Sequence, residues 1–146
     1  MPEQDTLKRA AADKAAGKSP STQAGEFVRE EIEHIREGKH GARSAKQAIA
    51  IGLAKARRAG VNLKPPKEGE ASDAVREQAE RDLAKGKSKT SKSTKRSRAA
   101  FRALKKEGHS AASKTVLSRH ARKAAAKRSA AARSRSAKKA AATRKK

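Results

Sequence analysis

Positive charge is concentrated in one half of the chain, and this limits what that half can fold into. Residues 85–146 hold 23 Lys and Arg against a single acid, Glu107, a net charge of +22. Residues 1–84 hold sixteen basic groups and fourteen acids, a net charge of +2. Compact folding of a like-charged segment raises its electrostatic energy, whereas contact with a phosphate chain relieves the repulsion and releases counterions. Nucleic acid is therefore the predicted partner.

Large apolar side chains are too scarce for a large core. Ala supplies most of the hydrophobic content, and Phe27 and Phe101 are the only aromatic residues. Burial contributes roughly 25 cal/mol per Å² of apolar surface, whereas ordering costs about 1–2 kcal/mol per residue. We expect an all-α protein with short helices, a helical hairpin with little core, and a long basic C-terminal segment that is partly disordered when free.

Helix-capping signals place a hairpin at residues 19–64. Ser19 precedes Pro20, a favourable first helical residue, and Gly38 provides a stop. Ser44 and Gln47 have capping-box spacing, which predicts a second helix that ends at Gly60. Ile49, Leu53 and Ala56 share one face of that helix, with Ala45 and Gly52 allowing close approach.

The rest of the chain divides around this hairpin. Residues 1–18 lack large apolar groups and are expected to form a flexible arm. A Pro-containing linker at 65–71 leads to a short helix at 72–86, capped by Ser72 and terminated by Gly86. The remaining segment, 87–146, is the basic tail.

The tail is expected to contain weak helices. Residues 87–97 have no apolar side chain and should be disordered when free, as an intrinsically disordered region is. Helical periodicity returns at 99–106 and 113–128. The segment 107–113 also echoes 37–44, with His and Ser at the same separation. Two interpretations stay open here, a diverged duplication and chance similarity in low-complexity sequence.

Cations at helical spacing mark the tail as the main binding surface. Arg119, Lys123 and Lys127 form a stripe, widened by Arg122 and by Lys138 if the helix continues. Ala between them keeps the helix thin enough to approach a groove and reach its phosphates, with folding coupled to binding. The predicted nucleic-acid-binding residues are Lys95, Arg96, Arg98, Arg102, Lys105, Lys106, Arg119, Arg122, Lys123, Lys127, Arg128, Arg133, Arg135, Lys138 and Lys139.

Recognition by this tail is expected to be insensitive to sequence. Readers of base edges need fixed side chains on a rigid scaffold, and readers of single strands need stacking aromatics. The tail is repetitive, poor in Asn and Gln, and nearly free of aromatics. Duplex DNA is the favoured partner. A structured-RNA or ribosome-associated role is the alternative, and a tail that merely improves solubility is a further reading.

The hairpin carries two charged surfaces of its own. A secondary phosphate-binding edge is predicted near the start of its second helix, where free backbone N–H groups also favour anions. Its residues are Lys39, His40, Arg43, Lys46, Lys55, Arg57 and Arg58. The first helix is acidic. Its acidic surface could bind a protein partner, bind the basic tail of the same chain as a decoy, or simply be solvated. Its residues are Glu26, Glu30, Glu31, Glu33 and Glu37.

Enzymatic signatures are missing from the sequence. There is no Cys and no phosphate-binding loop motif. Glu33-His34 lacks the second His of a zinc helix, and His34 with His40 has no further carboxylate at ligand spacing. His109 and His120 are extra phosphate contacts or surface groups. We therefore predict no enzyme activity, no metal site and no cofactor.

The predicted location is the cytoplasm of a bacterium, at the nucleoid. No stretch approaches the ~20 apolar residues of a membrane span. The first residues are polar and acidic rather than those of a signal sequence. A nuclear import signal at 95–98 is disfavoured because a short basic cluster is nearly unavoidable in this composition.

Two segments resemble known families. The Lys/Ala-rich tail, including Lys123-Ala124-Ala125-Ala126-Lys127 and Ala137-Lys138-Lys139-Ala140-Ala141-Ala142, resembles the tails of linker histones and bacterial histone-like nucleoid proteins. This resemblance implies an architectural protein that neutralises and compacts DNA. Residues 37–53 resemble a hairpin signature of an uncharacterised family of small basic bacterial and phage proteins, which brings no established activity.

Overall fold

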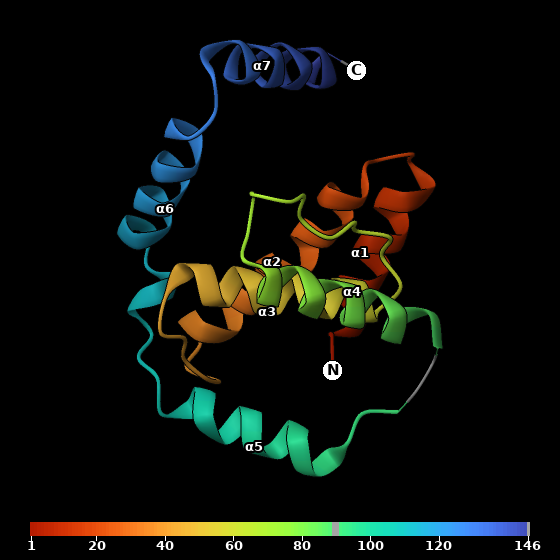
Figure 1. The fold of residues 1–146 in the computed structure, drawn as a ribbon, viewed down its shortest axis with the longest axis vertical. Helices are drawn as coiled ribbons and strands as arrows, with labels where there is room; N and C mark the ends of the chain where they lie inside the picture. Colours follow the sequence, from red (N-terminus) through yellow and green to blue (C-terminus); the bar gives the residue numbers. More distant parts are fainter. Residues whose placement is uncertain (89–90, 146) are drawn as a thin grey trace.

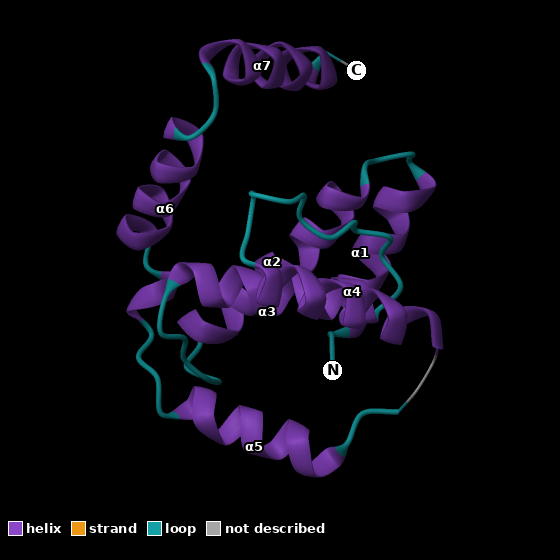
Figure 2. Cartoon of the chain, in the orientation of Figure 1, coloured by secondary structure: helices purple, strands orange, loops and turns teal. Residues whose placement is uncertain are grey.

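A computed structural model, which describes residues 1–88 and 91–145, confirms that the chain is all-α (Figures 1 and 2). The described residues contain one 3₁₀ helix, η1, and no strand beyond a single bridge between Glu68 and Ala71. The helices are α1 Gln4–Ala15, α2 Pro20–Arg36, α3 Ala45–Arg58, α4 Asp73–Ser88, α5 Thr94–Lys105, η1 Ser110–Ala112, α6 Lys114–Ala126 and α7 Ala130–Arg144. None of the helices in this described part has the length and hydropathy of a membrane span.

The caps predicted for α2 and α3 are confirmed. Ser19 Oγ accepts from Thr22 N at 3.4 Å, and Ser44 Oγ accepts from Gln47 N at 3.2 Å. The return contact of the second cap differs from a capping box, because Gln47 Oε1 accepts from Arg43 N at 2.7 Å instead of from Ser44. Each helix therefore starts where its sequence signal lies.

Helices α2 and α3 pack as an antiparallel pair. Phe27, in the middle of α2, shares a cluster with Ala56, late in α3, whereas Ile35, at the end of α2, shares another cluster with Ala48, early in α3. Between the two clusters, a Cβ atom on Gly52 would lie 2.6 Å from Val28 Cα. The crossing thus depends on a residue without a side chain.

Residues 1–18 are not the flexible arm that the sequence predicts. Most of this segment forms α1, which packs on α2 with Thr6 and Ala10 buried. Arg9 Nε lies 2.6 Å from Glu26 Oε2 and closes the contact. The prediction was wrong because small residues and an ion pair, rather than large apolar groups, make this interface.

Helix α4 packs on α3 and continues past its predicted stop at Gly86. A Cβ atom on Gly86 would lie 2.1 Å from Arg57 O, so this glycine allows close helix packing instead of ending the helix. Asp82, 1% exposed, lies 2.6 Å from an Nη atom of Arg58. Because the Arg58 side chain is 35% exposed, solvent screens this pair more than it would a fully buried one.

The basic half is helical rather than partly disordered, which corrects the prediction for the tail. Its three long helices start after serine N-caps, Ser93, Ser113 and Ser129. Helix α5 already begins at Thr94, inside the segment 87–97 that was expected to be disordered; Lys89 and Thr90 of that segment lie outside the described residues. Local capping and the high helix propensity of Ala and Arg account for this order.

Part of the basic half also completes the core. Ala111 and Ala112 are buried against Ile32 and Ile35, and Arg36 Nε donates to Ala112 O at 2.9 Å. The 3₁₀ helix and the start of α6 therefore pack beside the hairpin.

The two similar segments 37–44 and 107–113 lie against each other. Gly41 N donates to Leu104 O at 2.9 Å, and Ala42 N donates to Gly108 O at 3.0 Å. Arg43 adds an ion pair to Glu107 at 3.4 Å. Backbone hydrogen bonds therefore join the turn between α2 and α3 to the turn between α5 and α6.

Candidate nucleic-acid interface

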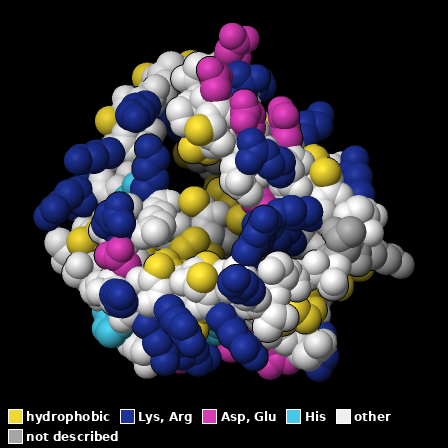
Figure 3. Space-filling model, turned by 60° about the horizontal axis from the view of Figure 1, so that its bottom comes forward, with side chains coloured by type: hydrophobic (Ala, Val, Ile, Leu, Met, Phe, Trp, Pro, Cys, Tyr) yellow, Lys and Arg dark blue, Asp and Glu magenta, His cyan; other side chains and the backbone are white. Residues whose placement is uncertain are grey.

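All fifteen predicted nucleic-acid-binding cations are exposed, on α5, α6, α7 and the residues that join them. These three helices form an arc around α1–α4, and α6 and α7 extend away from the core (Figure 1). Figure 3 shows Lys and Arg side chains spread around a hollow on one face, with hydrophobic side chains in its floor. The cations are thus accessible to a long polyanion.

Few protein groups neutralise these cations within the described chain. The half has one acid, Glu107, which already faces Arg43. Lys105 Nζ lies 5.3 Å from the centre of the Phe101 ring, and Arg128 donates to Ala132 O and Ser136 Oγ. None of these contacts removes positive charge from the arc.

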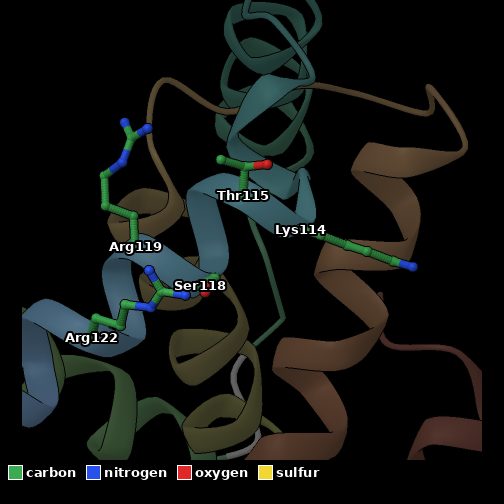
Figure 4. Close-up of a pocket in the computed structure, with 5 residues that line it drawn as sticks. All are labelled: Lys114, Thr115, Ser118, Arg119 and Arg122. Carbon is green, nitrogen blue, oxygen red and sulfur yellow. The ribbon is translucent and has the colours of Figure 1, made fainter.

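A concavity of about 440 Å³ lies on α6 (Figure 4). Its lining residues are Lys114, Thr115, Ser118, Arg119 and Arg122. In the close-up the guanidinium of Arg122 lies beside Ser118, whereas the side chain of Lys114 extends in another direction. Three cations and two hydroxyls match the oxygen atoms of phosphate groups.

Sequence reasoning identified only Arg119 and Arg122 of this concavity. The signal for the others was present, because Lys114, Ser118 and Arg122 are four residues apart, as are Thr115 and Arg119. Residues at that spacing share a helix face.

The predicted cationic stripe does not run into Lys138. Helix α6 ends at Ala126, and α7 begins at Ala130 after its cap, Ser129. The break occurs because the Ser129 side chain accepts from Ala132 N at 3.2 Å, which starts a new helix. Arg119, Lys123 and Lys127 therefore belong to one helix and its C-cap, and Lys138 belongs to another.

The predicted secondary phosphate edge is mostly engaged inside the protein. His40 and Arg57 are buried, Lys55 contacts Glu31, and Arg58 contacts Asp82. Arg57 donates to Leu63 O at 3.1 Å and to Lys64 O at 3.4 Å, and burial lowers its pKa. Hydrogen bonds to Glu37 and Glu3 raise the pKa of Lys39. Lys39, Arg43 and Lys46 are exposed, and the first two are paired with Glu37 and Glu107.

The acidic helix is not the open surface that its sequence suggests. Glu30 and Glu31 are 2% and 1% exposed and point into the interface with α3, where Lys55 meets both. The other three acids have partners nearby: Glu26 with Arg9, Glu33 with Arg29, and Glu37 with Lys39. A protein-binding face or tail decoy built on all five residues is therefore wrong for the two buried ones.

The structure brings a carboxylate to the two histidines that seemed to lack one. Glu31, His34 and His40 each offer a ligand atom, and the three atoms lie within 4.8 Å of one another. Glu31 and His34 are three residues apart on α2, a spacing that puts them on one helix face. The turn at residues 37–44 then returns His40 to that face.

No curated protein and no solved structure matches this chain. Residues 12–68 match one family model, described as a family of unknown function (DUF6496). The match runs from the middle of α1 through α3, and segment 37–53 lies inside it. Over the hairpin, and not over the basic arc, the chain is thus similar to that family of unknown function.

Proposed function

We propose that the protein binds duplex DNA without sequence specificity, as an architectural protein of the bacterial nucleoid. The main support for this proposal is that all fifteen predicted cations on α5–α7 and the residues that join them are exposed. The single acid of this basic half, Glu107, is already paired with Arg43. Each phosphate contact releases counterions, which supplies most of the free energy of non-specific binding.

The arrangement of the helices favours a duplex over single strands. Phe101 is the one aromatic residue in the basic half, and its ring packs edge-on near His40 with centroids 6.2 Å apart. The ring is 45% exposed, but one ring alone cannot stack a run of successive bases. Short rigid helices with exposed cations instead suit the phosphates on the walls of a groove.

Contacts with the core orient the cationic surface of α6 relative to the hairpin. Because η1 and the start of α6 are tied to α2 and α3, the α6 concavity has a constant position relative to the hairpin. Helix α7 has no buried residue and follows a short break, so it can adjust to the path of the duplex. The hairpin thus serves as a base from which the cationic helices extend.

The test is a salt titration of binding to matched duplex DNA and structured RNA. The full chain is compared with a Lys114→Gln, Arg119→Gln, Arg122→Gln variant. Three lost phosphate contacts should reduce the slope of log K against log salt by about 2–3. The measurement is fluorescence anisotropy of a labelled duplex.

A second triple variant provides the control. Lys14, Lys64 and Lys67 are exposed cations of the first half, so their replacement by Gln removes the same charge from a different surface. This variant should keep the wild-type slope. Equal slopes for both variants would contradict an interface on α6, and tighter binding to structured RNA at the same salt would replace DNA as the partner.

A further inference from the structure

We propose that Glu31, His34 and His40 bind a divalent transition-metal ion of the zinc type, which ties α2 to the turn at residues 37–44. This site is separate from the cationic arc and does not depend on the proposed function. The three ligand atoms lie within 4.8 Å of one another, and Glu31 and His40 are buried.

The contacts of His40 indicate that a proton or a metal ion lies between its ring and Glu31. Nδ1 lies 3.0 Å from Gly41 O, a carbonyl that only accepts, so Nδ1 carries a proton. In the neutral ring Nε2 then presents a lone pair, and it faces Glu31 Oε1 at 3.0 Å. Two lone pairs at that distance repel, so a proton, carried by the ring or by the carboxylate, or a metal ion lies between them.

The geometry of the pair suits a metal ion. Zinc binds His N and carboxylate O at about 2.0–2.2 Å, so two ligands on one tetrahedral ion are about 3.4 Å apart, which a small movement of this 3.0 Å pair would reach. The Gly41 contact is also the outer-shell bond that fixes the tautomer of a metal-bound histidine. Because Nδ1 of His40 is hydrogen-bonded to Gly41 O, Nε2 is the nitrogen that can bind the ion.

The Glu31 carboxylate is buried and has its two charged or basic neighbours on different oxygens. It is 1% exposed. Lys55 Nζ lies 2.6 Å from Oε2, which leaves Oε1 for the ion on the side of His40. Lys55 and the ion would thus share the charge of one buried carboxylate.

Glu3 supports the third ligand. Its Oε1 lies 2.9 Å from His34 Nε2, and its backbone N donates to Glu30 Oε2 at 3.0 Å. A carboxylate on a ring nitrogen orients a histidine ligand. Two imidazoles and one carboxylate form a set typical of zinc, cobalt or nickel rather than of magnesium or calcium.

The test uses the full chain with Co²⁺ and Zn²⁺. Co²⁺ should give visible d–d absorption at one ion per chain, and Zn²⁺ should displace it and raise the melting temperature. His34→Gln and Glu31→Gln should weaken binding by more than the 10–100-fold typical of an outer-shell group. His120→Gln, which removes a histidine outside the cluster, should bind as the wild type does.

Folding of each variant is checked by circular dichroism, because Glu31 is buried. A ring ¹⁵N spectrum of the wild type gives an independent readout, since a metal-bound nitrogen and an imidazolium nitrogen differ in chemical shift. Metal-dependent shifts at His34 and His40 support the site. The absence of Co²⁺ absorption, binding that survives His34→Gln, or an imidazolium spectrum unchanged by Zn²⁺ would overturn it and leave a protonated His40–Glu31 ion pair.

Discussion

Gly52 marks the place where α3 comes closest to α2. Because a Cβ atom there would lie 2.6 Å from Val28 Cα and 2.9 Å from Val28 N, Gly52→Ala must push two backbones apart. Such overpacking typically costs 1–3 kcal/mol. We expect a lower urea midpoint with a similar m-value, measured by loss of helical ellipticity.

Gly25 is the matched control within the same hairpin. It lies inside α2, and an added Cβ would meet nothing within 4 Å. Gly25→Ala should stabilise the protein by about 0.5–1 kcal/mol because Ala restricts the unfolded chain. The same chemical change should thus move the midpoint in opposite directions, and a stabilising Gly52→Ala would contradict the close crossing.

Individual charged residues were the hardest to place from sequence. The sequence marks Glu30 and Glu31 as part of an acidic face and Lys55 and His40 as part of a basic edge. The structure buries both acids in contact with Lys55 and brings His40 to Glu31. Opposite charges that neutralise each other across two helices look like two solvated surfaces when each helix is considered alone.

At the scale of the elements, local interactions alone account for α7. It has no buried residue, and its cap, Ser129 Oγ, accepts from Ala132 N. Ser129→Ala should cost α7 about 1 kcal/mol and lower the total ellipticity. The urea midpoint of the α1–α4 core should not change.

Ser134→Ala is the control for that cap. Ser134 is exposed in the interior of α7, where Ala has the higher helix propensity, so this variant should gain a little ellipticity. A fall in ellipticity for both variants would show that the hydroxyl of Ser129 has no special role.

Helix starts could be predicted where a serine cap precedes them, as at Ser19 and Ser44. The stops and contacts of helices were less predictable. Gly86 is a residue type that often ends a helix, but it lies inside α4. Its lack of a side chain leaves room for Arg57 O. Helix α1 was missed because burial of Thr6 and Ala10 leaves little hydrophobic signal in the sequence. The α6 concavity was partly predictable, since its cations follow helical spacing.

For the whole molecule, the division into a folded half and a separate tail does not hold. A chain that ends at Ala84 loses Ala111 and Ala112 from the core, and two hydrogen bonds from the backbone of Gly41 and Ala42. We expect its free energy of unfolding to fall by about 2–4 kcal/mol, at roughly 1 kcal/mol per hydrogen bond plus the lost burial. Urea denaturation measures this.

A chain that ends at Lys127 keeps all of these contacts and lacks only α7 and the residues around it. Its midpoint should stay within about 0.5 kcal/mol of the full chain. Similar stabilities for the two shortened chains would mean that the basic half does not support the hairpin. Charge composition alone suggested that the hairpin and the basic half are independent. Composition does not reveal that Ala111 and Ala112 of the basic half are buried against the hairpin.

The bond from Arg36 to Ala112 also sets an order in time. The two residues are 76 positions apart in the sequence. The hydrogen bond from Gly41 N likewise needs an acceptor far along the chain, Leu104 O. At a synthesis rate of about 5–20 residues per second, the hairpin leaves the ribosome roughly 4–15 s before the segment that covers it. During that interval its apolar face is open, so the newly made chain is most prone to aggregation before its most highly charged part is complete.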